Sequence, residues 1–351
     1  IALAAIAALA AVAYSQRALI AERVMEKALP SRMGANLLDQ LPDGLHVGLC
    51  GAGGPMPSPV ASGPCVVVAA GQRLFMIDSG TNGVRNLARM GFQPGTLEAV
   101  FLTHFHSDHL DGLGETGTIR WAGGDNTKPL PVYGPKGIKK VVRGFNLAYS
   151  QDFTYRHDHH GDTVAPLSGA GLKAMQFNKP PIGELTAVIS DGQLKVEALA
   201  VDHAPVEPAV GYRFSYKGRS LLITGDTVKS ANIEKFATGV DVLVHEGLAP
   251  NLVNMMHDAA VETGNQIMAK ITYDVLDYHA SPVEAAETAR DAGVGHLIYY
   301  HIVPPLIIPG QELLYLNGAQ DIFPNYTLGQ DGVLFSLPAN SDEIVKVSDG
   351  L

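Results

Sequence analysis

The sequence predicts an α/β protein built as four layers, in the order helix, sheet, sheet and helix (αββα). Short β-rich runs fall into a front half and a rear half of the chain, and helix-like segments accompany both halves. The 351 residues are 46% hydrophobic and only 17% charged, which is too apolar for a disordered chain and sufficient for one large domain. The 38 glycines and 22 prolines follow no period, so they indicate many short turns and exclude a fibrous repeat.

The front half contains four predicted strands and one predicted helix. Each strand is a short apolar run bounded by turn residues, and the helix ends at Gly91. We expect the strands at residues 46–50, 65–69, 73–77 and 99–102, and the helix at residues 84–90. The last of these strands leads directly into a group of histidines.

The rear half repeats this pattern after a less regular middle region. We expect residues 114–191 to be largely irregular, with residues 136–149 as the only helix among them. Further strands are expected at residues 193–199, 210–214, 220–223, 241–244 and 296–300, and helices at residues 253–271 and 281–292. Ser281 followed by Pro282 is typical of a helix start.

An uncharged apolar run occupies residues 1–13. Its length and its Ala-Val-Ala end are typical of a secretory signal, and further apolar residues upstream would make it a membrane anchor. The alternative is an N-terminal apolar docking helix that ends at Pro30. We therefore expect an N-terminal apolar segment at residues 1–30 and a hydrolase domain at residues 31–351, in a periplasmic or exported protein that residues 1–20 could attach to a membrane.

The two cysteines, Cys50 and Cys65, lie in two predicted strands that would form one hairpin. They could form a disulfide in an exported protein, or they could remain two buried thiols. Two cysteines cannot build a disulfide scaffold or a multi-cysteine zinc site.

The formal net charge of −10 disfavours a nucleic-acid partner, because nonspecific nucleic-acid affinity comes mostly from lysine and arginine. A nucleic-acid enzyme would need a local basic patch. Lys139, Lys140 and Arg143 mark one face of the helix predicted at 136–149, which is either a solvated face or a patch that steers anions. The 13 histidines are numerous for this length, so we look for chemistry among them.

A cluster of candidate metal ligands follows the strand at 99–102. Within six residues the chain offers His104, His106, Asp108 and His109, side chains that suit a metal such as zinc. Further candidates follow later strands or turns, at His203, Asp226, His279 and His301. Strand ends meet at one edge of a sheet, where binding sites usually lie.

This pattern resembles the metallo-β-lactamase superfamily, whose signature is H-x-H-x-D-H, and the resemblance extends over about residues 45–335. The resemblance implies the four-layer αββα metallo-β-lactamase sandwich with two bound Zn²⁺ ions. Mn²⁺ or iron could replace zinc, since Asp108 and Asp226 are hard ligands. It also implies that His104, His106 and His203 hold the first metal, that Asp108, His109 and His301 hold the second, and that Asp226 bridges them.

Other segments resemble the RNase Z and arylsulfatase-like branch of this superfamily. They include residues 49–59, the sequence His245-Glu246-Gly247 and the sequence His279-Ala280-Ser281. By this resemblance His279 would donate a proton to the leaving group, Glu246 would orient His279, and Asp108 would orient the attacking hydroxide. The threonine that the branch carries after its H-E motif is replaced here, because Leu248 follows Gly247.

The resemblance implies a dinuclear hydrolase of phosphate diesters or aryl sulfate esters that uses a metal-bridging hydroxide. We expect a small-molecule anionic ester as the substrate, no nucleic acid, and a homodimer as one state that such folds adopt. Cleavage of tRNA is disfavoured because the short interval between His203 and Asp226 holds no basic RNA-binding arm. The alternatives are a lactonase or β-lactamase-like hydrolase on the same site and a non-catalytic, metal-stabilised envelope binding scaffold.

Three residues of the middle region are candidates for substrate binding. Arg156 could contact phosphate or sulfate oxygens, and Tyr149 and Tyr155 could hold an aromatic leaving group. The alternative is a solvated loop. Met255 and Met256 could belong either to a lid over the site or to ordinary core.

Overall fold

The computed structural model describes residue 6 and residues 13–351 of the chain. The predicted apolar run at residues 1–13 therefore lies almost entirely outside the described residues. The chain divides into two units, Ile1–Leu37 and Leu38–Leu351. Among the helices of the described residues, none is long and apolar enough to cross a membrane.

The first unit contains helix α2 (Arg17–Met33). The predicted end of this helix at Pro30 is wrong, because Pro30 lies inside the helix and Gly34 follows its last residue. A proline near a helix end removes only one backbone hydrogen bond, so the helix can continue for a few residues. The expected N-terminal apolar helix is not confirmed, since Arg23, Glu26 and Lys27 lie among the apolar residues of α2.

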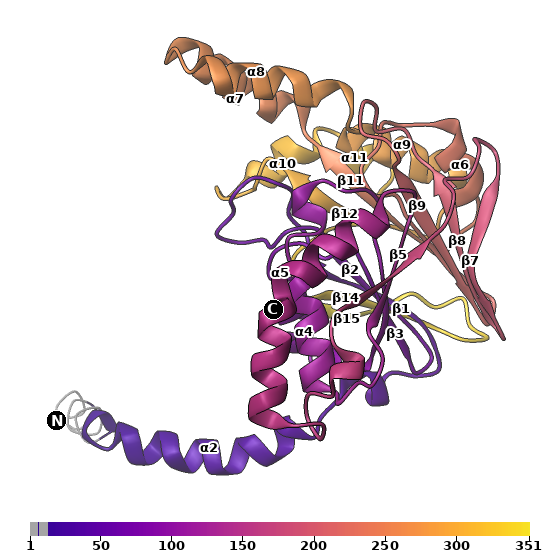
Figure 1. The fold of residues 1–351 in the computed structure, drawn as a ribbon. Helices are drawn as coiled ribbons and strands as arrows, with labels where there is room; N and C mark the ends of the chain where they lie inside the picture. The colour runs from indigo at the N-terminus through magenta and orange to yellow at the C-terminus, as the bar shows by residue number, and fades with distance from the viewer. Residues whose placement is uncertain (1–5, 7–12) are drawn as a thin grey trace. The chain divides into compact units, whose positions relative to one another are not determined.

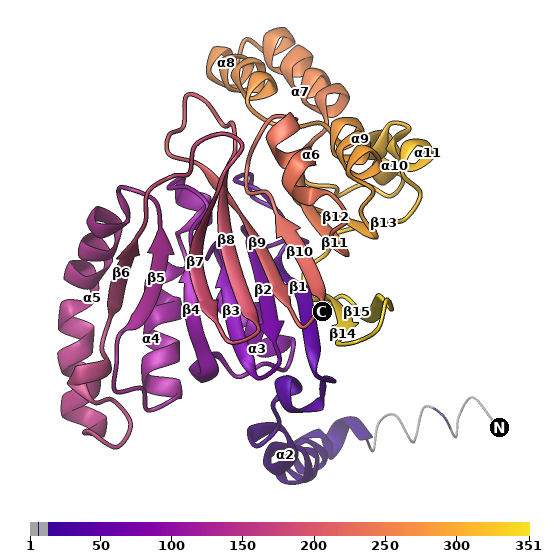
Figure 2. The same cartoon turned by 90° about the vertical axis from the view of Figure 1, so that its right-hand side faces the viewer.

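The second unit contains two β-sheets that pack face to face (Figures 1 and 2). The first sheet has eight strands in the order β15-β14-β1-β2-β3-β4-β5-β6. Its strands are β1 (Gly44–Gly51), β2 (Cys65–Ala70), β3 (Arg73–Ile77), β4 (Leu97–Phe101), β5 (Leu130–Gly134), β6 (Leu172–Gln176), β14 (Val333–Pro338) and β15 (Val345–Asp349). The four strands predicted in the front half are confirmed as β1 to β4. Strands β1 and β2 pair antiparallel, and the hairpin they form is closed by a disulfide between Cys50 and Cys65.

The second sheet has seven strands in the order β13-β12-β11-β10-β9-β8-β7. Its strands are β7 (Leu185–Asp191), β8 (Leu194–Ala200), β9 (Val210–Tyr216), β10 (Arg219–Ile223), β11 (Val242–Leu248), β12 (His296–Val303) and β13 (Tyr326–Leu328). The predicted rear strands correspond to β8 to β12. The core between the two sheets includes a group of aromatic rings, among them Phe75, Phe101 and Phe214.

Helices cover the outer faces of both sheets, so the predicted four-layer order is confirmed (Figure 1). The first sheet contacts α3 (Gly83–Arg89), α4 (Leu113–Gly123) and α5 (Ile138–His160). The second sheet contacts α6 (Ala231–Ala237) and α9 (Pro282–Ala292), while α10 (Gln311–Leu316) and α11 (Ala319–Ile322) pack on α9. Short 3₁₀ turns lie at η1 (Leu37–Gln40), η2 (Pro94–Thr96), η3 (Ser107–His109), η4 (Leu167–Gly169) and η5 (Val275–Asp277).

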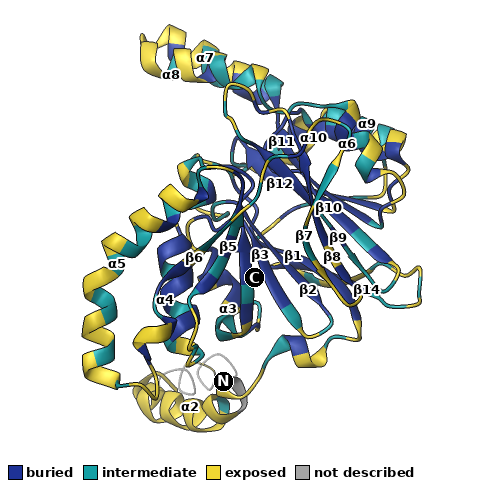
Figure 3. Ribbon diagram, turned by 45° about the vertical axis from the view of Figure 1, so that its right-hand side comes forward, coloured by how far each residue is buried: buried dark blue, intermediate teal, exposed yellow. Residues whose placement is uncertain are grey.

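The middle region is more regular than expected, because residues 114–191 contain α4, β5, α5, β6 and β7. Gly114 and Gly117 interrupt the apolar pattern of α4, yet they allow it to pack closely against Tyr149 and Leu172. The helix predicted at 136–149 continues to His160. The prediction was too short because the second half of the helix is mostly exposed (Figure 3) and carries no strong apolar period.

The single helix predicted at residues 253–271 is two helices, α7 (Pro250–Glu262) and α8 (Gln266–Asp274). The chain reverses at Gly264, whose φ of +71° is a left-handed conformation that favours glycine. Asn265 then begins α8, because its side chain accepts a hydrogen bond from the backbone N–H of Met268.

Candidate metal centre and active site

Seven candidate metal ligands come from four places in the second unit. His104, His106, Asp108 and His109 lie on the loop after β4, which contains η3. His203 follows β8, Asp226 follows β10, and His301 lies within β12. The first group comes from one sheet and the others from the second sheet, so the site forms only when both sheets have packed together.

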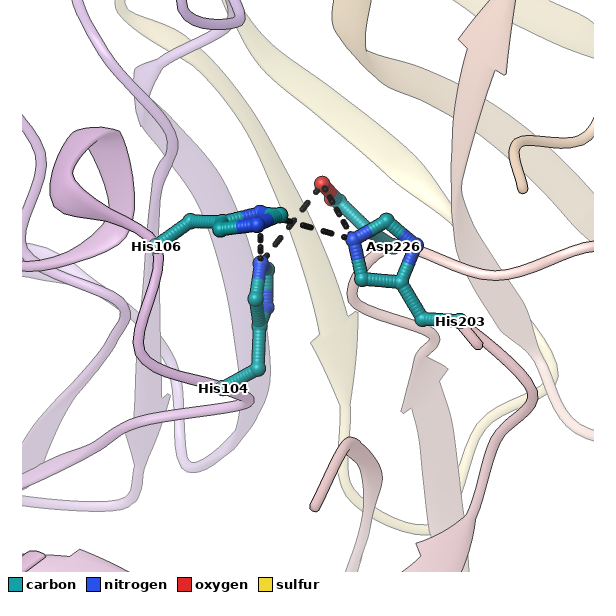
Figure 4. Close-up of side chains that lie close together, drawn as sticks. All are labelled: His104, His106, His203 and Asp226. Atoms are coloured by element: carbon teal, nitrogen blue, oxygen red, sulfur yellow. Dashed lines mark hydrogen bonds and ion pairs between the residues drawn. The ribbon is translucent and has the colours of Figure 1, made fainter. Parts of the chain in front are cut away.

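One cluster contains His104, His106, His203 and Asp226 (Figure 4), whose candidate ligand atoms all lie within 4.8 Å of one another. His104 Nε2 is 3.0 Å from His106 Nδ1, and His203 Nε2 is 3.5 Å from that same atom. Asp226 Oδ2 is 3.8 Å from both His104 Nε2 and His203 Nε2. Three imidazoles and one carboxylate around a single point are a suitable ligand set for zinc.

A second cluster contains Asp108, His109 and His301. Asp108 Oδ2 is 3.3 Å from His301 Nε2 and 3.5 Å from His109 Nε2. Asp226 Oδ2 is 3.3 Å from each of those two nitrogens. The Asp226 carboxylate therefore lies between the two clusters.

The chemistry of the cluster fits bound cations. His109 Nε2 and Asp226 Oδ1 are buried and have no hydrogen-bond partner among the described residues. Burial lowers the pKa of His104 well below its usual value, which favours the neutral imidazole that binds metals. Burial alone would raise the pKa of Asp226, but the surrounding imidazoles, His301 first, hold it well below its usual value. The two His/Asp clusters are thus suitable for metal binding.

Residues outside the ligand set hold the imidazoles in place. Asp78 Oδ2 is 2.8 Å from His109 Nδ1 and accepts a hydrogen bond of the same length from the Thr103 hydroxyl. The backbone N–H of Thr103 donates to Asp78 Oδ1 at 2.9 Å. On the other side, His203 Nδ1 is 2.9 Å from the carbonyl oxygen of Tyr278. Asp78 was not among the residues predicted for the site, although its position directly after β3 places it at the same sheet edge as His104.

His279 and Glu246 form a buried pair beside the metal cluster. His279 Nδ1 is 2.9 Å from Glu246 Oε1, which also accepts a hydrogen bond of 2.8 Å from the backbone N–H of Thr227. The His279 ring stacks on the ring of His301, with the ring centres 5.6 Å apart. Burial opposes protonation of His279, but the Glu246 carboxylate outweighs it and raises the pKa of His279 to about 9.

A pocket of about 460 Å³ opens over the metal cluster. Its polar floor includes His106, Asp108, Asp226, His279 and His301. Its apolar wall includes Met56, Leu248, Val253, Met256, Met268, Ile271, Val275 and Val303. Helices α7 and α8 supply much of this wall, so Met256 lines the site, whereas Met255 is 62% exposed to solvent.

The structure does not bring Arg156, Tyr149 and Tyr155 into this pocket. All three lie on α5, where the Arg156 guanidinium pairs with Asp152 at 2.7 Å. Arg156 and Tyr149 line a different groove, bounded by α3, α4 and α5, and Tyr155 is 65% exposed to solvent.

The fold and the His/Asp clusters define a metal-dependent hydrolase. Residues 73–302 match the family described as Beta-lactamase superfamily domain. The chain therefore belongs to the metallo-β-lactamase superfamily.

Curated relatives narrow this class. Ribonuclease Z of Mycobacterium bovis (strain BCG / Pasteur 1173P2) is 34% identical over 270 residues, which cover 76% of this chain and 89% of the relative. Ribonuclease Z of Mycolicibacterium gilvum (strain PYR-GCK) is 35% identical over 274 residues, which cover 76% of this chain and 87% of the relative.

Solved structures agree on the fold. Human tRNase Z, short form, matches with a TM-score of 0.56 and 19% identity, over 84% of this chain and 99% of that chain. The metallo-beta-lactamase fold protein YhfI from Bacillus subtilis matches with a TM-score of 0.57 and 18% identity, over 83% of this chain and 98% of that chain.

These relatives correct two predictions. The expectation of a small-molecule anionic ester substrate and no nucleic acid is wrong, because the relatives are named for acting on RNA. The net charge was the basis for excluding nucleic acid, but it describes the whole chain and not the surface beside the site. The expectation of a periplasmic or exported protein is contradicted by the same relatives, which are named Ribonuclease Z.

Proposed function

We propose that this protein hydrolyses phosphodiester bonds of RNA with two divalent metal ions, and we expect these ions to be zinc. The observation that carries the proposal is the buried His279–Glu246 pair beside a double His/Asp cluster, in a chain whose relatives are named Ribonuclease Z. Aryl sulfate hydrolysis finds no support in these relatives.

In the proposed assignment His104, His106 and His203 hold one metal, and Asp108, His109 and His301 hold the other. Asp226 would be a ligand shared by both sites, and its position between the two clusters supports this role. Two metals bound there would supply a nucleophilic water at neutral pH and neutralise the charge of a phosphodiester. Mn²⁺ or iron could also occupy sites with two carboxylates.

Asp108 and His279 are the proposed catalytic residues. The Asp108 side chain is 13% exposed and lines the pocket, where it can accept a hydrogen bond from the attacking water and orient it. His279 lines the same pocket and can donate a proton to the departing ribose oxygen. Glu246 is a positioning residue, because it holds His279 Nδ1 and keeps that imidazole protonated near neutral pH.

The test compares two substrates that differ in the quality of the leaving group. We expect the purified chain to cleave an RNA with a single-stranded 3′ extension, and a chelator to abolish the cleavage. The substitution His279→Ala should slow RNA cleavage by about 10²- to 10⁴-fold, the usual contribution of a general acid. It should slow hydrolysis of bis(p-nitrophenyl) phosphate far less, because nitrophenolate leaves without a proton.

His159→Ala is the matched control, since His159 is exposed on α5 and does not line the pocket. An equal loss of rate on both substrates would refute the acid role of His279. Absence of RNA cleavage by protein that holds two metals would refute the proposed function.

A further inference from the structure

The first two turns of α5 and the residues just before them carry a concentrated positive charge. Lys136, Lys139, Lys140 and Arg143 lie within eight residues and are all exposed. None of these four side chains forms an ion pair or a side-chain hydrogen bond with any other described residue. They form what we call the α5 basic face.

The helix itself fixes this face toward solvent. Ile138 and Val142 are buried against the protein, which turns Lys139, Lys140 and Arg143 outward. Lys139 and Arg143 are four residues apart on the helix, so their like charges are neighbours and repel each other. The chain has a formal net charge of −10, so three neighbouring cations without acidic partners form a local excess of positive charge.

The basic face begins beside the metal cluster. A Cβ atom at Gly137 would lie 2.8 Å from Cε2 of Phe105, so the start of α5 packs directly on that ring. Phe105 stands between the candidate ligands His104 and His106 in the chain. Strand β5, which leads into α5, is fixed to the same loop because the Leu102 N–H donates to the Tyr133 carbonyl at 2.9 Å. Figure 1 shows α5 running away from this edge of the first sheet.

We propose that the α5 basic face binds the phosphates of the RNA strand next to the cleaved bond. The inference rests on the proposed function for its ligand. Phosphate groups of single-stranded RNA repeat along the strand, and lysine and arginine on one exposed helix face can contact several of them in succession. The lining of the pocket includes no residue of α5, so only an anion longer than the pocket could reach this face.

The test measures RNA binding by the full metal-loaded chain. The variant Lys139→Ala/Lys140→Ala/Arg143→Ala is compared with its parent in a His279→Ala background, which slows cleavage during the measurement. Fluorescence anisotropy of a labelled RNA with a single-stranded 3′ extension gives Kd at several salt concentrations. We expect Kd to rise about tenfold or more near 0.1 M salt, and the slope of log K against log salt to fall by about 2, since each lost phosphate contact removes about 0.7.

The matched control is Lys27→Ala/Lys128→Ala/Lys173→Ala, which removes the same charge. These three lysines are exposed, form no ion pair with another described residue and do not line the pocket. A small and equal effect in both triple variants would overturn the proposal, because it would show only a change in net charge.

With His279 restored, hydrolysis of bis(p-nitrophenyl) phosphate should be unchanged in both triple variants. A loss of this activity in the α5 variant would also overturn the proposal, because it would indicate damage to the site. The wild-type chain could fail to cleave RNA while the α5 variant selectively loses RNA binding. That result would refute RNA cleavage as the function and would still support RNA binding by the α5 basic face.

Discussion

Asp78 acts on the proposed metal site through other side chains. Its carboxylate lies 2.8 Å from His109 Nδ1 and accepts hydrogen bonds from the backbone and the hydroxyl of Thr103. An anionic acceptor on the remote nitrogen fixes the imidazole tautomer and orients the other nitrogen toward a metal. The φ of Asp78, 55°, is left-handed, so the backbone adopts an uncommon conformation to place this carboxylate.

We expect Asp78→Asn to lower zinc affinity by about 10- to 100-fold, as loss of such partners usually does, while the fold is kept. Competition with a chromophoric zinc chelator measures the affinity, and circular dichroism checks the fold. Asp43→Asn is the control, because Asp43 is an exposed residue that pairs with Lys217. Unchanged zinc affinity in Asp78→Asn would show that Asp78 only holds the loop after β4 through Thr103 and does not affect metal binding.

The Glu246 carboxylate determines the charge of His279. Burial would lower the pKa of His279, and Glu246 raises it to about 9. A general acid must be protonated, so activity should fall as the pH rises through this pKa. Glu246→Gln keeps a similar shape but removes the charge, so the pKa of His279 falls.

The alkaline limb of the kcat/KM profile for RNA cleavage should therefore move to lower pH by about one unit or more in Glu246→Gln. Glu207→Gln is the control, since Glu207 pairs with Lys179 at the surface. An alkaline limb that does not move would mean that another group supplies the proton.

At the scale of single residues, the sequence predicted the candidate metal ligands better than the groups that form hydrogen bonds to those ligands. His104, His106, Asp108 and His109 carry a recognisable spacing, and the structure brings them together with His203, Asp226 and His301. The support of His203 is the backbone carbonyl of Tyr278, which has no signature in a sequence because every residue has a carbonyl. Asp78 was missed because a lone aspartate after a strand has many other uses.

At the scale of elements, α9 follows the proposed proton donor directly. Ser281 Oγ accepts a hydrogen bond of 3.2 Å from the Glu284 N–H, and Glu284 Oε2 accepts one of 2.8 Å from the Ser281 N–H. Ser281 followed by Pro282 was the signal that predicted this helix correctly, and the structure adds the capping box with Glu284. The cap also fixes the chain just after His279.

Ser281→Ala should lower the free energy of unfolding by about 1 kcal/mol, the usual value of such a cap. The midpoint of urea denaturation measures it, at an unchanged slope. Ser150→Ala, inside α5 and exposed, is the matched control and should leave the midpoint almost unchanged. Equal midpoints for both variants would contradict a stabilising role for the capping box.

Two helical elements were predicted with wrong limits for physical reasons. The pair α7 and α8 looked like one helix because the apolar period continues through Gly264, and only the left-handed φ of that glycine reveals the turn. The pair packs Met256 and Met268 on the pocket, a tertiary contact that local periodicity does not contain. Helix α5 was predicted too short because its second half is largely solvated.

At the scale of the whole molecule, the site depends on the packing of two sheets. The loop after β4 belongs to the first sheet, while His203, Asp226 and His301 belong to the second. The αββα order was predictable because strands and helices alternate in two halves. The whole-chain charge was a poor guide to the partner, because it averages away local groups such as the exposed cations at the start of α5.

The central claim is that the seven converging side chains hold two metal ions with Asp226 between them. The most direct test is the metal content of the purified full chain after zinc loading and gel filtration, measured by plasma mass spectrometry beside Asp226→Ala. The account predicts about two zinc ions per wild-type chain and at most about one in the variant, because a shared carboxylate holds both ions. One ion or none in the wild-type chain, or two in Asp226→Ala, would contradict it.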